Sequence, residues 1–289
     1  MKARYLFYIF VLIAFSLVSC KQKEKAAEMK IIFLHHSTGD VIWNGAPPNF
    51  FTKAARKVGS SFADQVTRKG YLPQLFESYN KEHHKNYLIE EMEFPKASPY
   101  GWNNYPFDYY NIWVNHAGEE PFNEEPTLEL LTKDYQLIIF KHCYPVSNIE
   151  PDQDSADINS YVHTVSNYKL QYNALKRKLH TFPETKFILF TGAVRVKSAL
   201  TEDEARRTKE FFTWVKEEWD QPGDNIYIWD LYNLQTDGGL YFKDEYAQSA
   251  DDSHPNGKFA KNAADLLFTR IIDVIENEGV GTQLTGEVK

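Results

Sequence analysis

Two short polar segments far apart in the chain carry the residues best suited to catalysis. The first, His35-His36-Ser37-Thr38-Gly39-Asp40, directly follows an apolar run that ends at Leu34. A serine hydroxyl there becomes a nucleophile if a base removes its proton, and the serine's own backbone N–H can help to stabilise the oxyanion that forms. A lone serine or threonine after a strand would more simply cap the next helix. Ser37 therefore indicates catalysis only if a base elsewhere in the chain can reach its hydroxyl.

The second segment, Asp251-Asp252-Ser253-His254-Pro255-Asn256, supplies a base and a carboxylate together. Asp251 can accept a hydrogen bond from one imidazole nitrogen of His254 while the other nitrogen faces a serine hydroxyl. The tetrapeptide from Asp251 to His254 is also consistent with an aspartate that caps a helix beside an exposed histidine. Position favours catalysis, because Ser37 follows the first predicted strand and His254 precedes the last predicted helix. We therefore predict a catalytic set of Ser37, His254 and Asp251.

The elements that must position these residues alternate along the chain. Short apolar runs typical of buried parallel strands occur at Lys30–Leu34, Leu137–Phe140, Phe187–Phe190 and Ile226–Trp229, with a more polar fifth, Tyr87–Phe94, toward an edge. Helical periodicity occurs at roughly Ser61–Glu82, Asp154–Phe182, Thr201–Trp219 and Asn256–Glu276. This alternation predicts an α/β fold with a mainly parallel sheet and helices on both faces.

Two long loops, Pro95–Pro126 and Gln235–Ser253, remain between these elements. Structureless stretches of this length are usually functional, and ligands in open α/β sheets bind at the carboxyl ends of the strands. We therefore expect both loops to form the site. The first contains the aromatic segment Tyr100–Trp113, for which core packing is favoured over a ligand platform because large aromatic side chains are usually buried.

In this layout the chain resembles the SGNH/GDSL hydrolase superfamily, through the serine after the first strand and the Asp-x-x-His pair before the last helix. The resemblance implies a flavodoxin-like three-layer α/β/α sandwich and serine ester hydrolysis. Leu34-His-His-Ser-Thr-Gly39 stands where the family has Gly-Asp-Ser, so Ser37 matches by place and type rather than by its neighbours. Asp251 and His254 match well.

The family's remaining motifs supply oxyanion donors, a glycine N–H and an asparagine side chain. Gly101 is a candidate for the first. The family's Gly-x-Asn-Asp is replaced by Lys141-His-Cys-Tyr-Pro-Val-Ser-Asn148, in which Asn148 or His142 could donate. His36 and Trp102 complete the candidate oxyanion and substrate-binding residues.

A metal site built on the adjacent histidines is the less favoured alternative. His35 and His36 could be joined by Asp40, Asp252 and His142, but neighbours on an extended segment point to opposite faces and need not share an ion. We predict no metal and no cofactor. For Cys143, a small buried side chain is favoured over a nucleophile, because its sequence neighbour His142 would rarely have the required geometry.

The N-terminus predicts export. Basic residues at 1–4 precede an apolar run, Leu6–Val18, and Leu17-Val18-Ser19-Cys20 resembles the bacterial lipobox. The resemblance implies lipidation of Cys20, an envelope location facing the periplasm or the surface, and membrane attachment through the lipid alone. The domains expected are a signal peptide at 1–19, a polar tether at 20–29, a hydrolase domain at 30–278 and a tail at 279–289. Cys143 is then the one other cysteine, so no internal disulfide is expected.

The formal charge of −8 argues against nucleic acid as a partner, because an acidic surface does not attract polyanions. Tryptophan and tyrosine near the expected site suggest a sugar, because aromatic faces pack on pyranose rings. We predict a serine esterase that removes acyl, chiefly acetyl, groups from a carbohydrate or another small ester. The alternatives are an O-acyltransferase, a non-catalytic glycan-binding protein and a metal-dependent phosphoesterase.

Overall fold

The computed structural model describes residues 29–47, 70–96 and 98–289. In this part of the chain five parallel strands form one sheet in the order β2-β1-β3-β4-β5, which is the flavodoxin-like order. The strands are β1 (Met29–His35), β2 (Tyr87–Glu93), β3 (Leu137–Phe140), β4 (Lys186–Phe190) and β5 (Ile226–Trp229). The central register pairs Phe33 with Ile139 and Ile139 with Ile188, so the middle of the sheet is apolar on both faces. The predicted strands and the edge position of β2 are confirmed.

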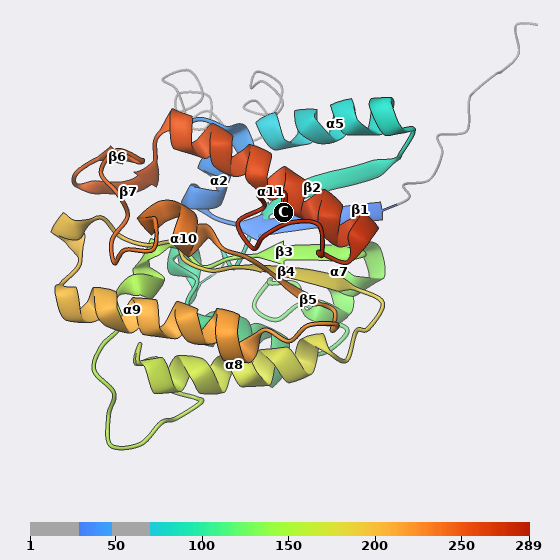
Figure 1. Cartoon of the computed structure of the whole chain (residues 1–289). Coiled ribbons are helices and arrows are strands. Elements are labelled where there is room, and N and C mark those ends of the chain that lie inside the picture. The colour runs from blue at the N-terminus through green and yellow to red at the C-terminus, as the bar shows by residue number, and fades with distance from the viewer. Residues whose placement is uncertain (1–28, 48–69, 97) are drawn as a thin grey trace, which may run out of the picture.

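Helices cover both faces of this sheet, which makes the domain a three-layer α/β/α sandwich (Figure 1). One layer holds α2 (Ser37–Asn44), α5 (Tyr71–His83) and α11 (Gly257–Asn277), which contact one another. The other holds α6 (Pro106–Tyr110), α8 (Val165–Leu179) and α9 (Glu202–Trp214). The remaining helices are α7 (Leu128–Asp134) and α10 (Leu231–Thr236), and a small antiparallel pair joins β6 (Ala247–Ser249) to β7 (Asp252–Pro255).

The boundaries of the predicted helices follow local capping chemistry. Thr201 and Glu204 form the expected capping box, in which the Glu204 N–H donates to Thr201 Oγ1 and the Thr201 N–H donates to Glu204 Oε2. The helix expected to begin at Asp154 instead begins after Thr164, whose hydroxyl accepts from the Asn167 N–H. The predicted signal peptide at 1–19, Cys20, residues 20–28 and the first part of the helix predicted at Ser61–Glu82 lie outside the described residues.

The two long loops contain more structure than the sequence indicates. Residues 95–126 include α6 and short helical turns at Gly101–Asn103 (η1) and Asn111–Asn115 (η2). Most aromatic residues of this loop are buried, as the core interpretation requires, whereas Tyr105 and Phe122 are partly buried and Trp102 is 50% exposed. Tyr109 and Trp113 pack against Phe140 of β3, so the loop is anchored to the sheet.

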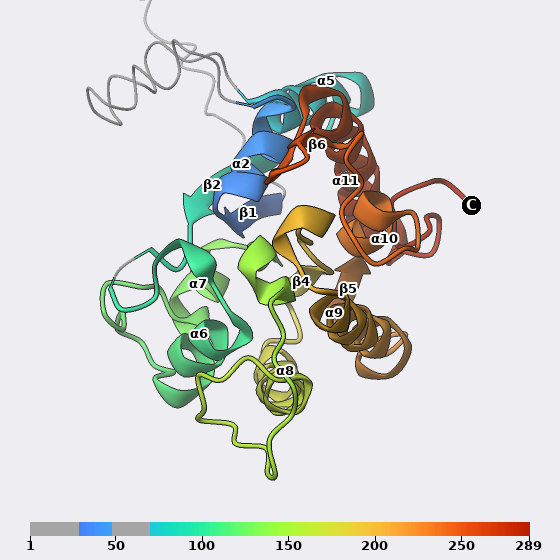
Figure 2. The same cartoon turned by 90° about the vertical axis from the view of Figure 1, so that its left-hand side faces the viewer.

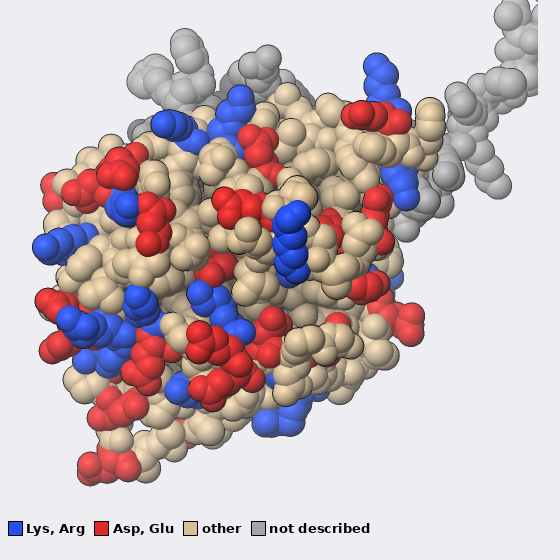
Figure 3. All heavy atoms as spheres, in the orientation of Figure 1, with Lys and Arg blue, Asp and Glu red and all other residues tan. Residues whose placement is uncertain are grey.

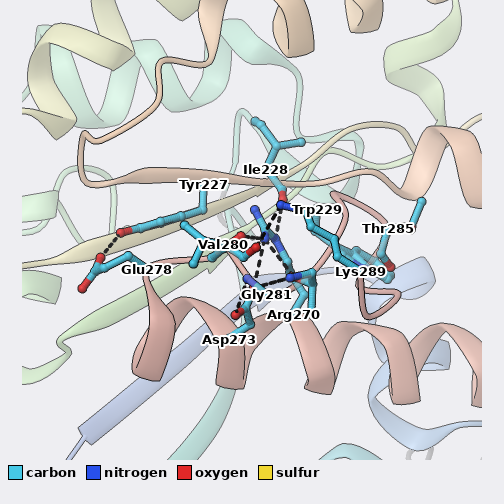
Figure 4. A network of polar contacts seen from close by, with 12 residues as sticks. Tyr227, Ile228, Trp229, Arg270, Asp273, Glu278, Val280, Gly281, Thr285 and Lys289 are labelled. Atoms are coloured by element: carbon cyan, nitrogen blue, oxygen red, sulfur yellow. Dashed lines mark hydrogen bonds and ion pairs between the residues drawn. The ribbon is translucent and has the colours of Figure 1, made fainter.

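Residues 279–289 pack on the domain surface formed by β5 and α11 (Figure 4). The buried Arg270 donates to the carbonyl oxygens of Ile228 and Gly279, and Asp273 accepts from the N–H groups of Gly281 and Thr282. The Trp229 indole N–H also donates to the carbonyl of Thr285. These contacts hold the segment expected as a tail against the last strand and the last helix.

Charged side chains of both signs are interspersed on the face shown in Figure 3, without a continuous basic area. Among the described helices, none combines the length and the apolarity that a bilayer crossing requires.

The close approach of α2 to the end of β1 depends on Gly39. A Cβ at this position would overlap with Cβ and Cγ of His35, which lie at the rigid base of a buried side chain. Glycine therefore allows α2 to begin immediately after the strand, with Ser37 in its first turn.

Gly39→Ala is expected to lower the free energy of unfolding by about 1–3 kcal/mol, because the added methyl group forces α2 away from His35. Denaturant unfolding measures the effect. Gly257→Ala is the matched control, because a Cβ there meets only Pro47 Cδ at an ordinary 3.6 Å. Equal stability of the Gly39→Ala and Gly257→Ala proteins would show that the close approach is not constraining.

Candidate functional site

The two polar segments meet at the carboxyl-end edge of the sheet. His254 Nε2 lies 2.9 Å from Ser37 Oγ, although the two residues are 217 positions apart in the chain. His254 Nδ1 lies 2.6 Å from Asp252 Oδ1. Because an ionised carboxylate only accepts, Nδ1 carries the proton and Nε2 is left to accept from the serine hydroxyl. The hydroxyl, imidazole and carboxylate therefore form one continuous chain of hydrogen bonds.

The carboxylate in this chain is Asp252, which corrects the prediction of Asp251. His254 and Asp252 both lie on the extended strand β7, where residues two apart project to the same face. The His254 N–H also donates to Asp252 Oδ1 at 2.9 Å, which fixes the carboxylate beside the ring. Asp251 lies in the turn before β7 and is exposed. The predicted spacing of three assumed a turn, whereas the strand geometry requires a spacing of two.

Several contacts hold β7 next to the start of α2. β7 pairs with β6, and Asn256, the residue after β7, caps α11 by accepting from the Phe259 N–H. The Asn256 side chain also donates to the carbonyl of Glu245 at 2.7 Å. Figure 2, which looks onto the carboxyl-end edge, shows β6 and α2 side by side there, and β7 contacts α2 directly. The position of His254 is therefore fixed from both ends of its strand.

The first turn of α2 offers backbone N–H groups near Ser37. The first bond of the helix ladder runs from the Asp40 N–H to the carbonyl of His36, so the earlier N–H groups have no acceptor within the helix. The Thr38 N–H is directed at the Cys143 thiol. Within the described residues, the Ser37 N–H has no acceptor, so it is available to an oxyanion formed on a substrate bound at Ser37.

Of the other residues predicted to donate to an oxyanion or to bind substrate, Asn148 has partners within the fold, and Gly101 and Trp102 lie in the loop after β2. Asn148 is engaged on both sides, because its Oδ1 accepts from Arg195 Nε and its Nδ2 lies 3.4 Å from Glu204 Oε1. Gly101 lies in η1 with φ +67°, and no atom lies within 4 Å of the position of its missing Cβ. Trp102 is half exposed, and its ring centroid is 5.9 Å from that of Tyr144.

The three histidines considered as metal ligands bind other parts of the fold. His35 Nε2 contacts Glu91 Oε2 of β2 at 2.9 Å, and His36 Nε2 donates to the carbonyl of Pro95. His142 lies between the carbonyl of Asn104 and the Tyr172 hydroxyl, and burial lowers its pKa to about 3. Burial also lowers the pKa of His36. Over the described ranges, no three histidine, cysteine or acidic side chains converge as a metal site would require.

The segment after β3 fills the space beneath α2 with a buried pair. Lys141 Nζ lies 3.5 Å from Cys143 Sγ, and both side chains are fully buried. Burial lowers the pKa of the Lys141 ammonium and raises the pKa of the Cys143 thiol. Cys143 is thus an interior residue of the site's floor, as the sequence interpretation favoured.

Two further residues beside the catalytic set were not found by sequence reasoning. Tyr144 packs edge-to-face on the His254 ring, with centroids 5.3 Å apart. The Arg195 guanidinium lies over the Tyr144 ring at 4.9 Å. Both residues follow predicted strands, β3 and β4, at the carboxyl edge. A polar side chain at that place was the signal available in the sequence.

A hollow of about 550 Å³ lies at the opposite edge of the sheet, near the starts of β4 and β5. Its lining includes His180, Lys186, Asp224, Tyr227 and Glu278. No residue of the hydrogen-bonded set reaches it. We place the site at Ser37 because the reactive groups are connected there.

Comparison with known proteins adds little beyond the fold. No protein-family model matches the chain, and no curated protein matches its sequence. Among solved structures, the chain is similar to a carbohydrate esterase whose active site is described as having divergent catalytic and non-catalytic binding functions. The TM-score is 0.40 and the identity 12%, over 86% of this chain and 70% of that one. Assignment of an activity must therefore come from the geometry of the site.

Ser37 is expected to react with a fluorophosphonate probe, because His254 can take its proton. Asp252→Asn should slow labelling by at least about 10-fold, since the asparagine no longer favours the imidazole tautomer that accepts from Ser37. Asp251→Asn, the matched neighbour, should leave the rate unchanged. Labelling is measured by gel fluorescence and located by peptide mapping. A slow Asp251→Asn variant with a normal Asp252→Asn variant would reverse the assignment.

Proposed function

We propose that this protein is a serine esterase of the SGNH type that removes acyl groups, chiefly acetyl, from a carbohydrate. The observation that carries the proposal is the connected chain from Ser37 Oγ through His254 to Asp252. A serine, a neutral imidazole and a carboxylate in this order activate the hydroxyl for attack on a carbonyl carbon. The all-parallel sheet and the position of Ser37 after its first strand also fit this type of hydrolase.

The reaction follows from the roles of the three side chains. Ser37 Oγ attacks the ester carbonyl while His254 Nε2 takes its proton, and Asp252 stabilises the imidazolium. The Ser37 N–H at the start of α2 faces the developing oxyanion, where the helix dipole adds favourable charge. His254 then gives the proton to the departing sugar oxygen. Water, activated by the same imidazole, frees the acyl group from Ser37.

The exposed aromatic surface beside His254 supports a carbohydrate as the alcohol part of the ester. Trp102 is half exposed, and Tyr144 lies between it and the imidazole ring. Aromatic rings in such positions pack against the apolar faces of sugars. The envelope location and lipidation at Cys20 remain part of this proposal and rest on the sequence of residues 1–20.

Ser37→Ala and His254→Ala are each expected to reduce ester hydrolysis by about 10³-fold or more, because each removes a group that the transition state requires. Turnover of p-nitrophenyl acetate and acetate release from acetylated oligosaccharides measure the effect. Ser78→Ala and His83→Ala on the exposed side of α5 are matched controls that should retain activity. Thermal unfolding should show all four variants folded.

Hydrolysis that persists in purified Ser37→Ala protein would exclude this mechanism. If the acyl group is passed to a sugar hydroxyl rather than to water, the products will show an acylated acceptor and no free acetate. That result would assign the same three residues to an O-acyltransferase.

A further inference from the structure

Arg195 is held beside the catalytic strand by backbone contacts. It follows β4 at the same sheet edge as Ser37, and the N–H of the next residue, Val196, donates to Ser253 Oγ at 3.2 Å. Ser253 lies on β7 between Asp252 and His254. Ser198 Oγ also donates to the carbonyl of Ala250 at 2.6 Å, in the turn before β7. The backbone of Arg195 is therefore fixed relative to the imidazole.

The Arg195 side chain is positioned as well. Its Nε donates to Asn148 Oδ1, and its guanidinium carbon lies 4.9 Å from the centroid of the Tyr144 ring. The same tyrosine ring lies 5.3 Å from the His254 ring. These two distances place the guanidinium within about 10 Å of the imidazole, a span that one substituted sugar ring can bridge.

The positive charge of Arg195 has no carboxylate partner among the described residues. Two other arginines of the fold do have such a partner, since Arg206 pairs with Glu202 and Arg270 with Asp273. Arg195 is half-buried, and within the described ranges its Nη atoms have no acceptor. A guanidinium always keeps its charge, and because Nε already donates to Asn148, the pair of Nη groups is the edge that remains for an anion from outside the chain.

We propose that Arg195 binds a carboxylate on the sugar, so that the substrates are O-acylated acidic sugars of the uronic acid class. This inference rests on the proposed esterase function and deepens it. Planar N–H pairs of a guanidinium match the two oxygens of a carboxylate. Tyr144 holds the guanidinium from one side, and the exposed ring of Trp102, 5.9 Å from the Tyr144 ring, offers a surface for the face of the sugar.

The surroundings favour a single carboxylate over a phosphate or a polyanion. Arg195 is one cation, and carboxylates lie near it, with Glu204 on the far side of Asn148 and Asp252 beside His254. The formal charge of the chain is −8. A multiply charged group would meet repulsion from these carboxylates that one guanidinium does not offset. A monoanion would gain the Arg195 contact with less opposing charge.

The test compares O-acetylated methyl glucuronoside with the methyl glucoside that carries acetate at the same hydroxyl, and repeats the pair with galacturonic acid and galactose. In the wild type, kcat/KM for at least one acidic substrate is expected to exceed that of its neutral partner by about 10-fold or more. In Arg195→Gln this ratio should fall to near one, and Arg195→Lys should lie between, because lysine keeps the charge without the planar fork. Lys197→Gln, an exposed cation two residues along, should keep the wild-type ratio.

Binding of free glucuronate and galacturonate, measured by calorimetry against glucose and galactose, separates this inference from the esterase proposal. Turnover without acid preference, or a preference that Arg195→Gln retains, overturns the acidic-sugar assignment and leaves the esterase. If uronate binds, Arg195→Gln abolishes that binding and no ester is hydrolysed, the carboxylate subsite is supported and the proposed esterase function is overturned. Neither turnover nor uronate binding overturns both. Circular dichroism and thermal unfolding confirm that each variant is folded.

Discussion

One hydrogen bond, from the Ser37 hydroxyl to His254 Nε2, joins the first strand to the segment before the last helix across 217 positions of the chain. It exists because all five described strands of the sheet run in the same direction, so the residues that follow them collect at one edge. β1 lies inside the sheet between β2 and β3, so Ser37 follows an interior strand, one strand in from the β2 side. The contact between Ser37 and His254 therefore depends on the order and direction of the strands, and no single sequence motif could produce it.

The direction in which successive side chains point along each element then determines which residues contact one another. On β7, a strand, side chains two positions apart share a face, and this is why Asp252 and not Asp251 contacts His254. At the end of β1 the chain turns directly into α2, which Gly39 permits by leaving room for His35. Ser37 thus begins a helix, where its own N–H is not used by the ladder. Local geometry thus sets the orientation of the His254 ring and leaves the Ser37 N–H outside the helix ladder, where the proposed mechanism needs a donor.

The sequence was sufficient for the parts of this arrangement that depend on local pattern. Apolar runs such as Leu137–Phe140 predict their strands because a central parallel strand is buried on both faces. The start of α8 is predicted too early, because residues 154–163 are rich in Ser, Asn and Asp, which favour turns and caps, and Thr164 is the residue that caps the helix. The donors proposed at Asn148 and Gly101 depend on loops whose paths are set by distant contacts, such as that between Asn148 and Arg195. The spacing of residues along the sequence does not predict such long-range contacts.

The segment after β3 lies at the same edge of the sheet, but its residues differ from those of the resembling family. Where the resembling family has Gly-x-Asn-Asp, whose asparagine donates to the oxyanion, this chain begins the segment with Lys141 and Cys143, which are both fully buried. These buried side chains form the floor of the site, so in the proposed mechanism the oxyanion donor is the Ser37 N–H at the start of α2. Tyr144, next along the chain, points instead to His254 and carries Arg195 on its ring. The turn after β3 thereby positions, beside the imidazole, a guanidinium that has no carboxylate partner among the described residues, and the proposed preference for acidic sugars depends on this arrangement.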